Sequence, residues 1–541
     1  GDPATENVRL VRVKANNSRN DSHIEYLYEY DSSEVPNISK IYDAEGNTYD
    51  IEYNSKDQVS RVIYPDGEAI ELTYSSGAAV AMEKTIDDVE SAEYLARDTQ
   101  TITRKIVDGD IVSSEKDIFN GYGNCISSTD AEGYVTNRVY SNKMLHRTES
   151  FVQSHYIDSD GYVVSEPDNV KTEISNYDAE SQNLIDETEE DGSFTTYGYN
   201  DNASGINKEL PVSEAETDGD GKAVFDIEHS YDSYGNETSE YDAVSDTTTV
   251  TEYYYEDSAK TLKGEVKKET EYLGTPQNGK LQSVTTYEYL YNSDGGKTEK
   301  TTQVCGGESI TTTVRYDSMG REIENTDSRG RRSVNSYDGY GRLIKTVNTD
   351  GDIVTETSKE YNNNGSVTIE TAEDGTVTEY TYDDMDRVVT RTVQKGNFSK
   401  TWNTSYSYED VTIFTGKGTQ TKTVENAFKT TETTPDGISE VTWQDHLGRV
   451  IREFKNGAYI DMTYDSQDNV ITQYEFAAGQ QDGKGLLTMH LYNSAGNKTH
   501  TILNPVYEQG RGFYTGNDAI VNEWEYDSSG NEIKRTDGEG N

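Results

Sequence analysis

Seven histidines, two cysteines and 100 acidic residues are the side chains of this 541-residue sequence that could do chemistry. The histidines show neither a His-Glu-x-x-His motif nor another paired spacing typical of a metal site. Cys125 and Cys305 lack a Cys-x-x-Cys spacing, so they are interpreted as two free thiols. The sequence also contains no phosphate-binding loop, nucleophile elbow or Rossmann glycine run. With so many carboxylates, an acid pair carries no information by itself. The histidines, each interpreted as incidental, are His23, His146, His155, His229, His446, His490 and His500.

These observations predict a protein that is not an enzyme, with no catalytic residue, no cofactor and no metal site. Two acidic turns invite a calcium interpretation, "DSDG" at 158–161 and "DGDG" at 218–221. Neither continues into the 12-residue loop with a terminal glutamate that an EF-hand needs. Plain Asp-Gly turns require no metal, so ordinary turns are the favoured interpretation, and calcium binding stays open.

The formal net charge of −52 limits the partners of the chain. Nucleic acids and anionic lipids are bound chiefly through Lys and Arg, so both are disfavoured. The basic stretch Arg329, Arg331 and Arg332 balances neighbouring carboxylates as readily as it would bind phosphate. No run approaches 18 apolar residues, and the N-terminus lacks a basic region followed by an apolar segment. The sequence therefore predicts neither membrane insertion nor a signal peptide.

The elements that must position these side chains follow a repeat. Tyr316 to Tyr337 is 21 residues, and the same step separates Tyr361 from Tyr382. Trp443 to Tyr464 is also 21 residues, with the tryptophan interpreted as taking the tyrosine's place. A fixed internal period of this length indicates a repeat array rather than several separate domains. With 42 Tyr among 541 residues, the chain is too aromatic for a disordered one, although only 32% of it is apolar.

Within one unit the pattern is strand, turn, strand, turn. In "YDGYGRLIKTVNTDGDIVTETSKEY", Asp338 can accept from backbone amides ahead of it and Gly341 can take a positive φ. Residues 343–347 are predicted as a strand, "NTDG" at 348–351 as the second turn, and "DIVTETSKEY" as the partner strand. Tyrosines two residues apart, as in Tyr380 and Tyr382, face the same side and are predicted to stack across neighbouring strands. The unit is a β-hairpin.

Two segments depart from this pattern. "DDVESAEYLARD" at 87–98 is either a helix or an irregular insertion, and 197–226, with Pro211, is predicted to be a long surface excursion. The predicted organisation is a loosely repeated β region at 1–110 and a hairpin array at 111–541, the two forming one continuous unit. The closing "TDGEGN" resembles the start of another turn, so the sequence is interpreted as a fragment of a longer chain.

The quoted turns resemble the YD repeats of bacterial Rhs and wall-associated proteins, of the C components of insecticidal toxin complexes, and of animal teneurins. "YDSMGREIENT" and "YDGYGRLIKTVNTDG" fit the pattern closely. "YDDMDRVVTRT" replaces the glycine by Asp386, and "WQDHLGRVIREFKNG" inserts Gln444 ahead of Asp445. The resemblance covers most of the chain and loosens before about residue 110. The residues assigned to the structural repeat are Tyr316, Asp317, Gly320, Arg321, Tyr337, Asp338, Gly341, Arg342, Asp350, Gly351, Tyr361, Tyr380, Tyr382, Trp443, Gly448, Arg449 and Tyr464.

The resemblance implies an all-β fold in which consecutive hairpins form a long, curved, spiralling antiparallel sheet, a partial or complete hollow shell. It further implies a non-enzymatic shell or scaffold of a secreted or cell-surface bacterial protein. Two alternatives stay open. One is the encapsulating shell of a toxin, whose partner is a C-terminal effector, although the sequence has no Asp-Pro-x-Gly-Leu self-cleavage motif. The other is a carbohydrate-binding or cell-adhesion module, whose partner is a cell-surface glycan or receptor. The oligomeric state is left unassigned.

Overall fold

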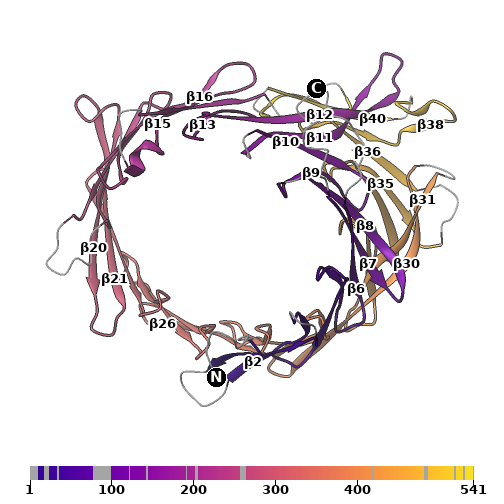
Figure 1. The fold of residues 1–541 in the computed structure, drawn as a ribbon, viewed down its shortest axis with the longest axis horizontal. Helices are drawn as coiled ribbons and strands as arrows, with labels where there is room; N and C mark the ends of the chain where they lie inside the picture. Colours follow the sequence, from indigo (N-terminus) through magenta and orange to yellow (C-terminus); the bar gives the residue numbers. More distant parts are fainter. Residues whose placement is uncertain are drawn as a thin grey trace.

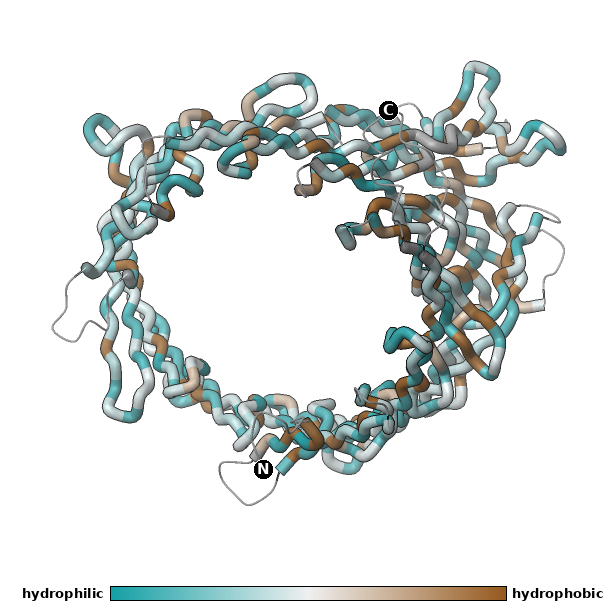
Figure 2. The backbone as a smooth tube through the Cα atoms, in the orientation of Figure 1, coloured by the Kyte–Doolittle hydropathy of each residue, from teal (hydrophilic) through white to brown (hydrophobic). Residues whose placement is uncertain are grey.

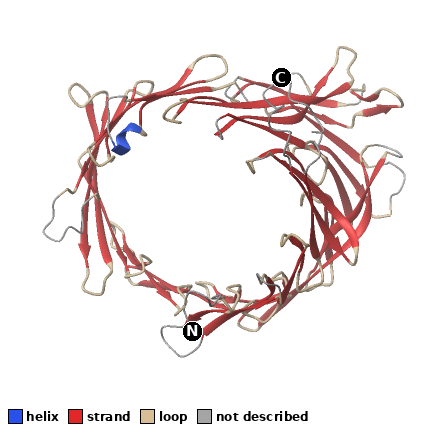
Figure 3. Ribbon diagram, viewed as in Figure 1, coloured by secondary structure: helices blue, strands red, loops and turns tan. Residues whose placement is uncertain are grey.

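The computed structural model describes residues 10–16, 23–32, 36–76, 99–120, 122–141, 144–189, 192–200, 205–255, 264–416, 420–479, 485–516, 519–527 and 530–539. Strands dominate these residues, and the helix among them is the 3-10 segment η3 (Gly205–Lys208) (Figure 3). Residues 87–98, for which a helix or an insertion is predicted, lie outside the described residues.

The strands follow one another along the whole described chain. The first are β1 (Arg12–Asn16), β2 (His23–Tyr30), β3 (Ile38–Tyr42), β4 (Thr48–Tyr53), β5 (Val59–Ile63), β6 (Ala69–Ser76), β7 (Thr99–Val107), β8 (Asp110–Phe119), β9 (Cys125–Thr129), β10 (Val135–Ser141), β11 (Met144–Ile157), β12 (Val163–Tyr177), β13 (Leu184–Thr188) and β14 (Phe194–Tyr199). The next are β15 (Pro211–Thr217), β16 (Ala223–Tyr231), β17 (Glu237–Asp242), β18 (Thr247–Tyr253), β19 (Val266–Leu273), β20 (Lys280–Tyr291), β21 (Lys297–Cys305), β22 (Glu308–Tyr316), β23 (Glu322–Thr326), β24 (Arg332–Tyr337), β25 (Leu343–Asp350), β26 (Ile353–Tyr361), β27 (Val367–Thr371), β28 (Val377–Tyr382) and β29 (Val388–Lys395). The last are β30 (Phe398–Phe414), β31 (Thr421–Thr433), β32 (Ser439–Gln444), β33 (Val450–Lys455), β34 (Ala458–Tyr464), β35 (Val470–Ala477), β36 (Leu486–Tyr492), β37 (Lys498–Leu503), β38 (Val506–Glu508), β39 (Gly512–Tyr514), β40 (Ile520–Tyr526) and β41 (Glu532–Thr536).

Thirty-nine of these strands form one antiparallel sheet in which each strand pairs with its neighbours in sequence. The separate hairpin β38–β39 is an insertion, so β37 pairs directly with β40. Figure 1 shows that the sheet curves into a ring that passes its own starting point. The chain climbs one side through β6 to β9, crosses through β12 and β13, descends through β20 and β21, and returns through β26. It then follows the first side again through β30, β31 and β36. The predicted spiralling sheet of consecutive hairpins is confirmed.

A β-bulge recurs in this sheet beside the tyrosine that ends a strand. In the pairing of β24 with β25, Ser336 lies opposite Lys345 but Tyr337 lies opposite Leu343, so one residue of β25 is left over. The same shift occurs at Tyr361 and Tyr464. Bulges bend the strand and increase its local twist. Bulges repeated at one edge give a long sheet a regular source of curvature.

The predicted excursion at 197–226 is wrong for most of its length. Pro211 begins β15, which pairs with β14 on one side and β16 on the other. Proline is tolerated there because it stands at the first residue of the strand, where its missing N–H interrupts no ladder. The predicted turn at 348–351 is shifted as well, since Asn348 and Thr349 pair within β25 and the reversal runs from Asp350 to Ile353.

The buried apolar side chains of the described residues fall into two groups, one between Ile24 and Val135 and one between Val411 and Ile502. From 136 to 410 no described apolar side chain is buried, and where this stretch does not overlap the other pass the wall is a single sheet. Figure 2 shows hydrophobic segments mixed with polar ones along the ring and gathered where the chain passes itself. One cluster, around Tyr474 and Leu487, packs against Ile157 and Val163 from the earlier pass. The hydrophobic core therefore lies where the second pass of the sheet overlaps the first.

Candidate functional site: the repeat joint and the seam

The turn after each tyrosine is held by an aspartate. Asp338 Oδ1 accepts from the backbone N–H groups of Tyr340 and Arg342, both at 2.9 Å, and Oδ2 accepts from Arg342 Nε at 2.7 Å. Gly341 closes the turn with φ +92°, the left-handed region that glycine adopts freely. Burial opposes ionisation of Asp338, but these hydrogen bonds stabilise the carboxylate and lower its pKa overall. The same contacts recur for Asp317 with Arg321, Asp383 with Arg387 and Asp445 with Arg449.

The arginine of each turn lies over the tyrosine of the next strand pair. The guanidinium carbon of Arg342 is 4.8 Å from the ring centroid of Tyr361. The hydroxyl of Tyr361 donates to the carbonyl oxygen of Leu343 at 2.6 Å, and Leu343 directly follows Arg342. One tyrosine therefore fixes both the arginine and the strand that leaves the turn. The equivalent sets are Arg321, Tyr337 and Glu322; Arg387, Tyr406 and Val388; and Arg449, Tyr464 and Val450.

We call this unit, the Asp and Arg of one turn, with the Gly or Asp386 between them, and the Tyr of the next strand pair, the repeat joint. A cation–π contact contributes about 0.5–1 kcal/mol and a hydrogen bond about 1 kcal/mol. Tyrosine rings also contact one another directly, but Tyr254 and Tyr289, with centroids 6.1 Å apart, meet edge to face at 75° and are not stacked as predicted. The arginine contact is the one that recurs from joint to joint.

Three further residues assigned from the sequence lie in the same array. Gly351 has φ +58° in the tight reversal between β25 and β26. Tyr382 donates its hydroxyl to the carbonyl of Val367 at 2.5 Å, as in a repeat joint. Tyr380 stands in β28 opposite Arg391 of β29.

Trp443 does not take the place of a repeat tyrosine. The bulge position of β32, opposite Val450, is held by Gln444. Because successive side chains of a strand point to opposite faces, Trp443 faces the other side, where it is 7% exposed in a core cluster. Its Nε1 donates to Glu409 Oε1 at 2.7 Å. The inserted Gln444 moves the bulge position one residue beyond Trp443. The 21-residue spacing from Trp443 to Tyr464 does not reveal this insertion.

The acidic turn at 158–161 and the basic stretch at 329–332 make hydrogen bonds and ion pairs within their own hairpins. Asp158 accepts from the N–H groups of Asp160 and Tyr162, as Asp338 does in its own turn. Arg331 pairs with Asp327 and Arg332 with Glu324, both at 2.6 Å.

His155 is buried in the sheet, and His490 is half-buried. His490 Nδ1 lies 3.0 Å from the hydroxyl oxygen of Thr501. Burial, and secondarily Lys498, lowers the pKa of His490 to about 4. Burial also lowers the pKa of His155, against a smaller opposing effect of Asp465.

The first and second passes of the sheet meet along a seam, formed by residues 43–162 of the first pass and 363–515 of the second. At one end Asn364 Nδ2 donates to Asp43 Oδ2 at 3.0 Å, and the N–H of Asn363 donates to Glu45 Oε1 at 2.6 Å. These partners are about 320 residues apart in sequence. One pass of the ring therefore takes about that many residues.

Arg387 belongs to a repeat joint and to the seam at once. Its guanidinium lies 3.3 Å from Asp66 and 3.9 Å from Glu68 in the first pass, while Nε holds Asp383 of its own turn at 2.8 Å. Lys105 of the first pass pairs with Glu68 at 2.8 Å and donates to the hydroxyl of a second-pass tyrosine at 2.5 Å. A joint built for turn geometry thus also binds the neighbouring pass.

Further along the seam, acidic residues of the first pass again lie beside basic residues of the second. Lys422 lies 3.5 Å from Glu132. Arg511 lies 3.3 Å from Asp160 and stacks over Tyr162 with its guanidinium carbon 3.8 Å from the ring centroid. The first pass supplies mainly carboxylates and the second mainly cations and N–H donors. A single exposed pair contributes about 0–1 kcal/mol, so the seam depends on several acting together.

Cavities lie at the seam. One of about 340 Å³ is lined by both passes, with Lys105 and Glu68 from the first and Tyr408, Phe428 and His446 among those from the second. Sequence reasoning missed the seam because its partners are hundreds of residues apart and because either side taken alone is an ordinary turn. The available signal was the difference between acidic turns such as "DAEG" at 43–46 and arginine turns such as "YDDMDR" at 382–387.

The fold and the repeat joint define a spiralling all-β wall built from YD-type hairpins, which is the architecture that the sequence resemblance implies. Among the described residues, no helix is long and apolar enough to cross a membrane. No family model matches the chain, and no curated protein matches it.

Among solved structures, the chain is similar to the Photorhabdus luminescens Tc holotoxin pore, with 10% identity and a TM-score of 0.31 over 96% of this chain and 34% of that one. It is similar to a chain in the crystal structure of TcdB2-TccC3-Cdc42, with 10% identity and a TM-score of 0.32 over 95% of this chain and 39% of that one. A porin-like protein from Bacteroides uniformis shows 12% identity and a TM-score of 0.14 over 63% of this chain and 95% of that one. The chain thus spans between a third and two fifths of the length of the toxin-complex chains. Because these identities and TM-scores are low, what the chain does is inferred from its own contacts.

Proposed function

We propose that this chain is a structural module, the non-enzymatic wall of a shell or scaffold in a secreted or cell-surface bacterial protein. The observation that carries the proposal is the seam. A sheet that served only as a spacer between its two ends would not need contacts between one pass and the next. Contacts between passes about 320 residues apart turn the sheet into a continuous wall. Residues 1–110 and 111–541 act as one array in this proposal, since the single sheet runs across residue 110.

A wall that overlaps itself is suited to enclosing a volume, so the encapsulating shell of a toxin is the specific form we favour. Its partner would be an effector segment of the same polypeptide. The test is limited proteolysis with intact-mass analysis of the whole encoded protein. A protease-resistant wall that retains a separate, self-released fragment supports a container. A single intact chain would exclude the container and leave the scaffold.

A carbohydrate-binding or adhesion role is supported by one exposed aromatic pair. Tyr234 is 56% and Tyr255 is 40% exposed, and their rings stack with centroids 6.0 Å apart at 27°. The Tyr255 hydroxyl donates to Asp232 Oδ2 at 2.6 Å, which fixes the ring. Exposed rings beside a carboxylate are the kind of surface on which sugars stack. A glycan-array screen comparing the natural protein with Tyr234→Ala checks this role, and equal binding by both would exclude the pair as the glycan site.

A further inference from the structure

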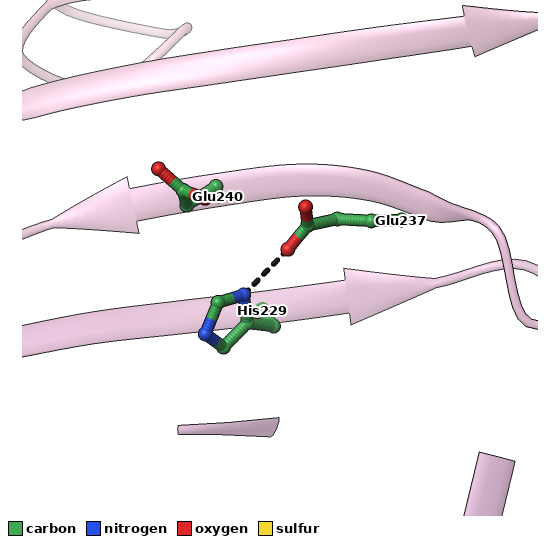
Figure 4. A group of neighbouring side chains, drawn as sticks. All are labelled: His229, Glu237 and Glu240. Atoms are coloured by element: carbon green, nitrogen blue, oxygen red, sulfur yellow. Dashed lines mark hydrogen bonds and ion pairs between the residues drawn. The ribbon is translucent and has the colours of Figure 1, made fainter. Parts of the chain in front are cut away.

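Three potential metal ligands meet in the single-layered part of the wall, away from the seam. His229 lies in β16 directly opposite Glu240 of β17. The bulge between Ser230 and Tyr231 brings Glu237 beside them. Figure 4 shows the Glu237 carboxylate turned toward the imidazole of His229, with the Glu240 side chain on the same strand as Glu237. One ligand atom from each residue lies within 4.8 Å of the others, and His229 Nδ1 is 2.5 Å from Glu237 Oε1.

The histidine at the centre of this group is largely withdrawn from solvent. Its side chain is 10% exposed, and its Nε2 is buried without a hydrogen-bond partner. The Glu237 side chain is 37% exposed, which leaves a path from solvent to the group. Nδ1 is the imidazole nitrogen that faces Glu237, so it is the histidine atom that a metal ion between these side chains would meet.

The surroundings favour a cation. The ring of Tyr231 stacks on the imidazole of His229 with centroids 6.1 Å apart. Glu237 and Glu240 place two carboxylates beside this imidazole, which is the one basic group within the set of three.

We propose that His229, Glu237 and Glu240 bind a divalent transition-metal ion, with zinc the best fit to one imidazole nitrogen and two carboxylate oxygens. Zinc takes such ligands at about 2.0–2.2 Å in a tetrahedral arrangement, which separates neighbouring ligand atoms by about 3.4 Å. The three side chains reach that spacing by small rotations, with water as the fourth ligand. The ion takes the place of the hydrogen bond between His229 and Glu237, and the neutral imidazole bound through Nδ1 carries its proton on Nε2.

The ion would cross-link two neighbouring strands. It joins β16 to β17 in the stretch of wall where no described apolar side chain is buried. This site is independent of the seam and of any enclosed partner, so it stands whether or not the wall proves to be a container.

The experiment is calorimetric titration of the purified chain with zinc chloride, followed by cobalt(II) absorption as a readout of coordination geometry. We expect one saturable site that weakens about tenfold or more in Glu240→Gln and in His229→Ala. Glu228→Gln is the matched control, because Glu228 precedes His229 on the same strand and points to the other face. Glu240→Gln keeps the hydrogen bond of His229 to Glu237, so it separates metal loss from misfolding. Absence of saturable binding, or equal binding by the natural chain and Glu240→Gln, would overturn the proposal and leave an ordinary His–Glu pair.

Discussion

Replacing Arg342 by lysine separates the shape of the repeat joint from its charge. Arg342 is 24% exposed in its side chain, and three of its contacts distinguish arginine from lysine or hold the turn. Nε binds Asp338, Nη1 donates to the carbonyl of Asn362 at 2.6 Å, and the guanidinium stacks on Tyr361. A lysine keeps the positive charge near Asp338, but it has no second planar N–H for Asn362 and no flat face for the ring.

The expected loss follows from the contacts that disappear. The hydrogen bond to the Asn362 carbonyl is worth about 1 kcal/mol, and the stacking on Tyr361 about 0.5–1 kcal/mol. Arg342→Lys should therefore lower the local stability of this joint by about 1–2 kcal/mol, although the net charge is unchanged.

The assay is native-state hydrogen exchange of the peptides covering β25 to β28, read by mass spectrometry. Repeat arrays open locally, so a local probe is more informative than one global unfolding midpoint. A loss of 1–2 kcal/mol raises the exchange of locally opening amides by about 5–30-fold. Arg329→Lys is the control, since the structure gives Arg329 a backbone hydrogen bond to Asp327 that lysine retains.

If Arg342→Lys exchanges at the rate of Arg329→Lys, arginine stacking is not what fixes the repeat. The joint would then depend on the aspartate turn alone. A rise confined to β25–β28 supports the joint as a local unit, whereas a rise along the whole sheet would show that the array opens cooperatively.

Three further results are expected. Tyr361→Phe removes the hydroxyl that binds the Leu343 carbonyl and should cost about 1 kcal/mol in the same exchange assay, and no change would mean that solvent already satisfies that carbonyl. His490 stays neutral in the folded chain because its pKa is about 4, whereas the unfolded chain takes up the proton below about pH 6.5. Stability should therefore be full above pH 6.5 and fall toward pH 4; the urea midpoint should drop between pH 7 and 5, less steeply in His490→Gln, and an identical slope in both would contradict this. The double variant Asp66→Asn with Glu68→Gln should open the seam, increasing protease cleavage near residues 383–387, most at low salt where the natural pairs are strongest, and an unchanged digest would remove these pairs from the seam.

Much of the fold could be predicted from the sequence because each hairpin is determined locally. Asp338 and Gly341 specify their turn by chemistry within five residues, and the period of tyrosines places the strands on either side. The failures occurred where local patterns were ambiguous. The sequence predicts a loop at Pro211, but proline is also compatible with the first residue of a strand. The sequence places Trp443 one residue away from the true bulge position, since the spacing of 21 residues does not reveal an inserted Gln444.

The candidate sites could be predicted far less well, because both are made by residues whose proximity depends on curvature or pairing. Arg387 and Asp66 meet only because the sheet turns through one full pass between them. His229 meets Glu240 through strand register, and Glu237 joins them through a bulge whose extra residue sets which face it occupies. A His-x7-Glu-x2-Glu spacing is not a recognised metal motif, so only the pairing of β16 with β17 gives it meaning.

The charge of the chain gains a structural role once the seam is known. With 100 acidic and 48 basic residues, carboxylates outnumber basic groups, and repulsion between passes would open the spiral if carboxylates faced one another. The second pass presents Arg387, Lys422 and Arg511 at the edge where the first presents Asp66, Glu132 and Asp160. Some of the scarce cations therefore lie where the two passes touch, and acidic residues elsewhere keep the remaining faces solvated. Contact between the passes depends on where these basic residues lie as well as on how many there are.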